Sequence, residues 1–342
     1  MKHKLLFTIL AICGSGLLLT SLISWTNKTP KANAADIRSS VIKSFSLLQT
    51  SGAKFIMKAK CASCHHATLT SMIAEKLKDK GITGVDTTAG MRVFAMTKTL
   101  EIVSNPNINS QFVSAKFLAP YNLLGLNAEK YPADFNTDIA VDYVISQALP
   151  DGSFKAEYAR VPLEMGDIHL TAFAIRAIQL FASPAKKAQT EKLITNSKLW
   201  LEKQKPAMQQ ELAFQLLGMQ WCGSSKDQKT GVAQRLISMQ NKDGGWSQLP
   251  TMQSDAYATG QALYALSESG AINTANEVYV NGVNFLLKTQ DASGAWLVVT
   301  RSNPIQPFIS SDFPPYDESQ FISAAATNWA TLALVDALPD KK

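Results

Sequence analysis

The strongest constraint on the fold is a repeated segment that is apolar at helical spacing on more than one face. Three copies align without gaps along the 342-residue chain, beginning at Asp167, Asp255 and Ser323, with threonine and alanine recurring at matching positions. Small and apolar residues all round a helix indicate that it is buried on nearly every side. Weaker copies occupy residues 70–77, 119–126 and 212–219.

Amphipathic helical segments with a different ending alternate with these buried ones. The clearest of them end in glutamine, pass through a glycine-containing turn and reach an aromatic residue, as in Gln240 to Trp246 and Gln290 to Trp296. Glycine permits the backbone conformation that such an exit turn requires. Partial copies end at Gln147, Gln204 and Gln49, and residues 87–103 complete the set.

The strict alternation predicts an all-α fold in a single domain spanning residues 35–338. Six buried helices would run parallel to one another inside, with six amphipathic helices antiparallel to them outside, and the pairs would close into an (α/α)6 toroid. A stack of pairs that does not close would be a solenoid. We expect closure, because the inner helices are too apolar to line an exposed concave face.

The glutamine-to-tryptophan segments resemble the QW motifs of squalene-hopene cyclases and related terpenoid cyclases, and the wider pattern resembles the prenyltransferase and squalene-oxidase repeat. With the weaker copies included, the resemblance covers roughly residues 35–338. It implies the toroid fold and an apolar or isoprenoid small molecule as a possible ligand. It is far less specific for activity, because this fold hosts many functions.

The resemblance also implies an acid at the start of an inner helix, where squalene-hopene cyclases carry an Asp-x-Asp-Asp cluster that protonates an alkene. Residues 253–256 are Gln-Ser-Asp-Ala here, which leaves Asp255 as the one carboxyl. A lone carboxyl lacks the neighbours that would make it a strong enough acid for an alkene. Asp255 and Asp167 are the candidate acids, and capping of a helix N-terminus is the structural alternative for each.

The N-terminal segment, residues 1–34, is predicted to be a signal peptide or an N-terminal anchor. Lys2 and Lys4 precede an uncharged apolar run, and the segment ends in the small-x-small pattern of residues 32–34. The rest of the chain is therefore expected outside the cytoplasm, periplasmic or secreted, with membrane contact only through this segment if it is not cleaved. The segment holds four lysines and no acid, so the formal charge of +6 becomes +2 without it, and nucleic acid is not an expected partner.

The motif that carries chemistry is Cys61-Ala-Ser-Cys64-His65, a C-x-x-C-H sequence of the kind that attaches c-type haem. The two thiols would bond to the haem vinyl groups and His65 would be the proximal iron ligand. Two alternatives remain open, a Cys61–Cys64 disulfide and a zinc site. Cys222 is expected to be a buried small apolar residue.

The repeat register places this motif at one rim of the ring. His66 aligns with Asp167, Asp255 and Met208 at the starts of inner helices, and His169 and Tyr257 follow two residues later. A haem anchored there would cover the mouth of the ring. His169 is the preferred distal ligand, with Met208 and His66 as alternatives.

A long connection punctuated by prolines, residues 297–318, is expected at the same rim. Long loops in compact domains often act as lids, and a packed surface loop is the alternative. The aromatic residues that could close over a ligand are Phe308, Phe313, Tyr316 and Phe321.

Three functions are consistent with these features, and no catalytic residue is assigned. The leading hypothesis is an exported toroid with covalent haem c at its mouth, which exchanges electrons with a redox partner protein or oxidises an apolar ligand. The second is a terpenoid-cyclase-type enzyme acting on an isoprenoid. The third is a non-catalytic binding or scaffold protein with a Cys61–Cys64 disulfide.

Overall fold

The computed structural model describes residues 30–60, 62, 64–103, 115–156, 161–302 and 311–341, with the backbone alone at Cys64 and His65. Over these residues the chain is helical, and its only extended pairings are two isolated bridges, Ala148 with Phe154 and Trp246 with Asp255. Within the same residues, none of the helices is both long and apolar enough to cross a membrane.

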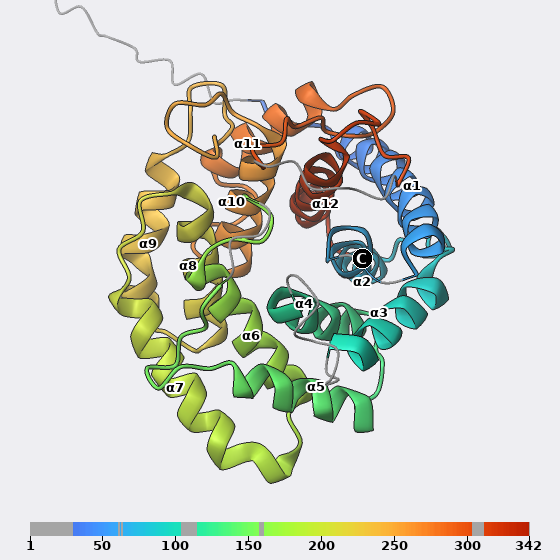
Figure 1. Cartoon of the computed structure of the whole chain (residues 1–342). Helices are drawn as coiled ribbons and strands as arrows, with labels where there is room; N and C mark the ends of the chain where they lie inside the picture. The colour runs from blue at the N-terminus through green and yellow to red at the C-terminus, as the bar shows by residue number, and fades with distance from the viewer. Residues whose placement is uncertain are drawn as a thin grey trace, which may run out of the picture.

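In the part of the chain that the structure describes, six α-helices form an inner ring and six surround it, as the sequence predicted (Figure 1). Each inner helix packs against the next, and α12 packs against α2, which closes the ring. The inner helices are α2 (Leu69–Asp79), α4 (Ala115–Ala128), α6 (Asp167–Phe181), α8 (Gln209–Trp221), α10 (Ala256–Glu268) and α12 (Gln320–Ala337). The outer helices are α1 (Ala34–Ala59), α3 (Ala89–Val103), α5 (Phe135–Ser146), α7 (Lys187–Lys203), α9 (Lys226–Ser238) and α11 (Glu277–Thr289).

The repeated threonine of the inner helices fixes the aromatic end of each glutamine-to-aromatic segment. The Thr259 hydroxyl accepts a hydrogen bond from the backbone N–H of Trp246 at 2.9 Å, and Thr327 does the same for Trp296 at 3.0 Å. Thr171 likewise accepts from the Phe154 N–H at 3.0 Å. Because these threonines are wholly buried, the contact explains why a polar residue recurs in an otherwise apolar helix.

The repeated glutamine links one outer helix to the next. Gln240 donates to the Val278 carbonyl in the first turn of α11 at 2.8 Å, and Gln290 donates to the Ser40 carbonyl of α1 at 3.1 Å. The second bond joins the last outer helix to the first. Gln49, at the end of the first, partial copy, makes the equivalent hydrogen bond to the Val85 carbonyl, which precedes α3, at 2.9 Å.

The ring is also closed by hydroxyl and amide contacts between its first and last helices. Thr70 of α2 donates to the Asn328 Oδ1 of α12 at 3.0 Å. The hydroxyls of Ser44 in α1 and Thr331 in α12 lie 2.7 Å apart.

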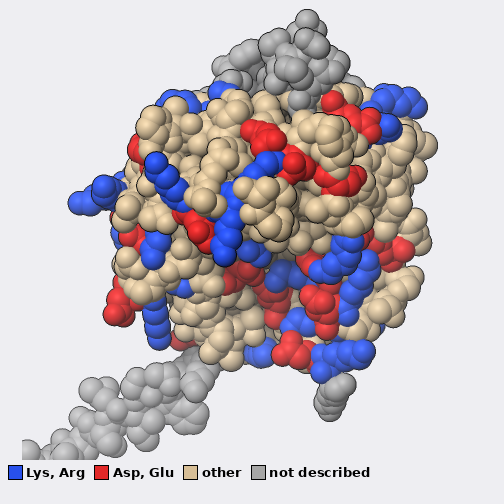
Figure 2. All heavy atoms as spheres, turned by 90° about the horizontal axis from the view of Figure 1, so that it is seen from below, with Lys and Arg blue, Asp and Glu red and all other residues tan. Residues whose placement is uncertain are grey.

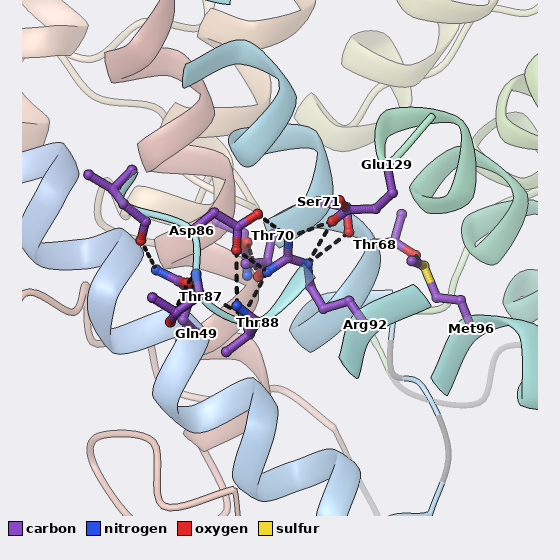
Figure 3. A network of polar contacts seen from close by, with 12 residues as sticks. Gln49, Thr68, Thr70, Ser71, Asp86, Thr87, Thr88, Arg92, Met96 and Glu129 are labelled. Carbon is purple, nitrogen blue, oxygen red and sulfur yellow. Dashed lines mark hydrogen bonds and ion pairs between the residues drawn. The ribbon is translucent and has the colours of Figure 1, made fainter. Parts of the chain in front are cut away.

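A buried ionic network joins α2, α3 and the end of α4, where the glutamine-to-tryptophan motif is incomplete (Figure 3). The Arg92 side chain is only 2% exposed and contacts both Asp86 and Glu129, at 2.7 and 2.5 Å. Its Nε also donates to the Ser71 hydroxyl of α2 at 3.0 Å.

On the face shown in Figure 2, Lys and Arg side chains are interspersed with Asp and Glu.

Candidate functional site

The rim at which the inner helices begin carries Asp167, Asp255 and Tyr257, three of the residues that the sequence singled out. Asp255 is the N-cap of α10 and accepts a hydrogen bond from the Ala258 N–H at 2.9 Å, so its predicted capping role is present. Its second oxygen accepts from Gln248 at 2.9 Å, and Gln248 in turn accepts from Arg301 at 2.7 Å. This rim therefore combines a carboxyl, an amide and a guanidinium.

The Asp255 carboxyl titrates above its ordinary range. Burial raises its pKa, and this effect outweighs the hydrogen bonds from Ala258 and Gln248 and the charge of Arg301, which lower it. A carboxyl held in this way keeps its proton to a higher pH than in water, and its raised pKa also makes it a weaker acid.

Tyr257 lies next to Asp255 in the first turn of α10 and is 2% exposed. Its hydroxyl donates to the Gln210 Oε1 of α8 at 3.0 Å. Burial raises the pKa of the phenol, so it remains protonated and acts as a donor.

Asp167, the other candidate acid, lies in a more open place at the start of α6. It accepts hydrogen bonds from Lys155 at 2.8 Å and from the Ala156 N–H at 3.0 Å, and its side chain is 25% exposed. A second carboxyl, that of Glu211 in the first turn of α8, lies close to Asp167. Burial and the charge of Asp167 raise the pKa of Glu211. No repeat position marks Glu211, because only the three-dimensional approach of α6 and α8 brings the two carboxyls together.

His169 lies in an aromatic cluster inside the ring and is 1% exposed. Its Nε2 is 2.9 Å from the Tyr121 hydroxyl, and its ring stacks on Phe214 with 3.8 Å between centroids. Burial lowers the pKa of His169 to about 3, although a backbone contact with Met165 opposes the shift. The Tyr121 contact occupies Nε2, one of the two nitrogens through which a histidine can bind iron.

His66 lies in a second aromatic cluster, beside the first turn of α2, and is also 1% exposed. It stacks on Phe55 with 5.0 Å between centroids and meets Phe313 and Phe321 edge-on at 6.5 and 5.8 Å. Burial lowers its pKa to about 3 as well. Met208, the remaining distal candidate, is the half-buried N-cap residue of α8.

Cys61 and the side chains of Cys64 and His65 lie outside the described residues, and their surroundings show how the motif is held. The backbone from Cys64 to Thr68 forms a π-helical turn that leads into α2. Between the two cysteines, the buried Ala62 donates its N–H to the Thr99 hydroxyl of α3 at 2.8 Å. Among the described residues, no cluster of three or more His, Cys, Asp or Glu could hold a metal ion.

The described ends of the proline-rich connection are packed onto this rim. Val298 and Thr300 donate their N–H groups to Ser323 and Ser319 at 3.0 and 3.1 Å. Phe313 is wholly buried, whereas Tyr316 is 67% exposed. Phe308 lies outside the described residues.

Repeat-equivalent residues of the inner helices meet in the interior of the ring. Tyr121 stacks on Phe173 with 4.5 Å between centroids, and Phe173 meets Phe214 edge-on at 5.5 Å. Phe214 of α8 contacts Trp329 of α12 at 6.0 Å, although α10 stands between these helices in the ring. Tyr121, Phe173, Phe214 and Trp329 form an aromatic column and occupy the same position in their repeats. The repeat register could have indicated this column, but the sequence does not show which repeat position faces the axis of the ring.

The fold is that of type II terpene cyclases. No protein-family model and no curated protein matches the chain. The apo structure of the type II terpene cyclase MstE from Scytonema has a TM-score of 0.57 at 12% identity, over 90% of this chain and 99% of that one. A variant of MstE in complex with the substrate geranylgeranyl dihydroxybenzoate has a TM-score of 0.59 at 11% identity, over 90% and 98%. At this identity the likeness establishes the fold and leaves the reaction open.

Proposed function

We propose that this protein is a terpenoid-cyclase-type enzyme that binds an isoprenoid inside the ring and protonates it from Asp255. The observation that carries the proposal is the half-buried Asp255 carboxyl at the start of α10, whose pKa is raised, on the rim of a terpene-cyclase fold. The aromatic column of Tyr121, Phe173, Phe214 and Trp329 provides an apolar lining. Because these rings contact one another, they must separate when a ligand enters.

The acid strength of Asp255 selects the kind of group that it can protonate. An alkene is a very weak base and requires a strong acid, whereas the pKa of this carboxyl is raised by burial. An oxygen function, such as an epoxide, is a better base and needs less acid strength. We therefore propose an oxygenated isoprenoid, and not an all-carbon polyene, as the substrate class.

The reaction balances without a co-reactant. Asp255 gives its proton to the epoxide oxygen as a carbon–oxygen bond opens, and an alkene of the same chain attacks the carbon that is left electron-poor. A proton lost from carbon at the end replaces the one that was donated, so the product is an isomer of the substrate.

The test is a product screen with matched substrates. Purified protein is incubated with geraniol, farnesol and squalene and with the terminal epoxide of each, and isomerised products are sought by gas chromatography and mass spectrometry. We expect cyclised isomers from an epoxide and none from the parent alkenes. No product from any epoxide would overturn the proposal.

The matched variants are Asp255→Asn and Asp167→Asn. Asparagine is as good an N-cap as aspartate, so Asp255→Asn keeps the hydrogen bond from Ala258 and removes the acidic proton, together with the oxygen that accepts from Gln248. Loss of product in Asp255→Asn and its retention in Asp167→Asn is the expected outcome. The reverse pattern would show that the proton donor is Asp167 and not Asp255.

A second candidate function, covalent haem c and redox chemistry, is supported by the placement of the Cys61–His65 motif. The described part of the motif, Ala62 and the backbone of Cys64 and His65, directly precedes α2, and the Ala62 N–H donates to the Thr99 hydroxyl of α3. Cys61 and Cys64 would attach the haem and His65 would bind its iron, and the group would supply one-electron transfer to a partner protein. This function also requires export, and the N-terminal segment is proposed to direct it.

The test of the haem function is a pyridine haemochrome spectrum of protein made in a host that matures c-type cytochromes. A covalent haem signal that disappears in a Cys61→Ala/Cys64→Ala variant supports it. Colourless protein under these conditions overturns it and leaves the two thiols, or their disulfide, to a scaffold role.

A further inference from the structure

Gln261 of α10 is a buried amide at a repeat position where the other inner helices carry aromatic or apolar side chains. It is 1% exposed, and neither its Oε1 nor its Nε2 has a hydrogen-bond partner among the described residues. The equivalent residues are Met72, Tyr121, Phe173, Phe214 and Trp329.

This repeat position faces the interior of the ring. Phe214 of α8 and Trp329 of α12 touch with 6.0 Å between ring centroids, and α10 packs against both of these helices. Helices on either side of α10 can meet in this way only across the ring interior. The shared register therefore directs Gln261 toward the same aromatic layer, with Tyr257 one turn above it and Tyr264 about one turn below on α10.

An unsatisfied amide at such a place needs an explanation. Most buried side-chain polar atoms have at least one partner, and leaving a buried amide unpaired is destabilising. The Tyr257 hydroxyl gives its proton to Gln210 at 3.0 Å, so it can only accept from the Gln261 Nε2, and the influence of Gln261 on the Tyr257 pKa shows that the two side chains are close. The Gln261 Oε1 is therefore left without a donor. Gln215, a buried glutamine on α8, shows the contrast at its nitrogen, since its Nε2 donates to the Leu201 and Gln204 carbonyls at 2.7 and 3.0 Å, whereas its Oε1 also has no partner among the described residues.

We infer that Gln261 recognises a second oxygen function on the ligand, at mid-depth in the ring, and this inference rests on the function proposed above. An amide both donates and accepts, so it suits a hydroxyl or a carbonyl group. Gln261 lies six residues beyond Asp255, which is about 9 Å along the helix axis. The ligand would therefore carry two oxygen groups roughly 9 Å apart, one beside the rim carboxyl and one in the aromatic layer.

The terminal epoxide of geraniol fits this description, because an isoprenoid chain separates its epoxide from its hydroxyl. Its deoxy analogue, with a methyl group in place of the hydroxymethyl group, is the matched probe. Binding can be followed by the fluorescence of Trp329, which belongs to the same layer, with a Trp329→Phe variant identifying the signal. We expect wild type to bind the hydroxylated probe about 5- to 100-fold more tightly than the deoxy probe.

Gln261→Leu is expected to abolish this preference while still binding the deoxy probe. If wild type and Gln261→Leu bind both epoxides with the same ratio, the inference is wrong although the proposed function stands. If wild type binds no epoxide at all, the proposed function fails. The stability of the ligand-free variants then shows whether Gln261 has a structural partner.

That second measurement compares Gln261→Leu with Gln215→Leu in urea unfolding. Removing an unpaired amide should leave the stability unchanged or raise it, whereas Gln215→Leu removes two hydrogen bonds and should lower it. If Gln261→Leu lowers the stability as much as Gln215→Leu does, Gln261 has a structural partner such as a bound water, and the inference is overturned.

Discussion

Replacing Arg92 by methionine is the sharpest test of what holds the first helices of the ring together. The guanidinium is 2% exposed and contacts the carboxylates of Asp86 and Glu129 (Figure 3), whose side chains are 10% and 3% exposed. Methionine fills a similar volume but leaves Glu129 buried without its ionic partner. Breaking a buried ion pair by removing one partner costs about 3–5 kcal/mol.

The assay is urea unfolding, followed by circular dichroism, of Arg92→Met and of a matched surface variant. Lys98→Met removes an exposed ion pair with Glu101, in which the side chains are 49% and 39% exposed, and such pairs contribute about 1 kcal/mol or less. We expect the free energy of unfolding to fall by about 3–5 kcal/mol in Arg92→Met and by less than about 1 kcal/mol in Lys98→Met. Equal small losses in both variants would refute the role of the network.

The network also predicts a dependence on pH. Burial alone would raise the pKa of the Asp86 carboxyl, but the hydrogen bond and the charge of Arg92 outweigh it and hold the pKa below its ordinary value. A carboxyl with a lowered pKa stabilises the fold above its unfolded-state pKa, and that contribution is lost as the pH falls through the folded-state value. Stability should therefore decline below about pH 4 in wild type, and less steeply in Arg92→Met.

Three further predictions concern the repeat and the interior. Thr259→Val removes the buried acceptor of the Trp246 N–H and should cost about 1–3 kcal/mol in urea unfolding; a loss near zero would contradict the role of the repeated threonine. Gly244→Ala should lower the free energy of unfolding by more than about 1 kcal/mol, because Gly244 has a φ of +88° and a Cβ there would lie 2.5 Å from the Asn281 carbonyl oxygen. The control is Gly231→Ala, which should leave the stability unchanged because a Cβ there would meet nothing within 4 Å. Burial lowers the pKa of His169 to about 3, so the protein should lose stability as the pH falls below about 6.5, where the unfolded chain binds a proton that the folded chain does not. The loss is about 2 kcal/mol at pH 5. A His169→Phe variant with the same pH dependence as wild type would contradict this prediction.

The architecture could be predicted from the sequence because the repeat carries it. Glutamine, glycine and tryptophan recur with fixed spacing, and the structure uses them for the same contacts each time, such as Gln240 with Val278 and Gln290 with Ser40. The number of helices, their alternation and the closure of the ring follow from that regularity.

The site was less predictable, because it depends on what faces the axis and on how deeply each group is buried. The rim positions of Asp255 and Tyr257 follow from the repeat register, but the hydrogen bond of Tyr257 to Gln210 depends on how α8 packs against α10. His169 is recognisable as a histidine near the rim, whereas its stacking on Phe214 is a property of the packed interior. The haem attachment of Cys61 and Cys64 stays a prediction.

The most direct test of the functional proposal is the rate of epoxide opening by wild type and by Asp255→Asn, measured on the epoxide that gives product. Asparagine preserves the helix cap and removes the acidic proton and the acceptor of the Gln248 hydrogen bond, so a Gln248→Leu variant, which lacks that hydrogen bond but keeps the acid, is the matched control. A positioned general acid typically contributes about 100- to 10,000-fold, so Asp255→Asn should be slower than wild type by at least about 100-fold. Equal rates for wild type and Asp255→Asn would show that Asp255 only caps α10.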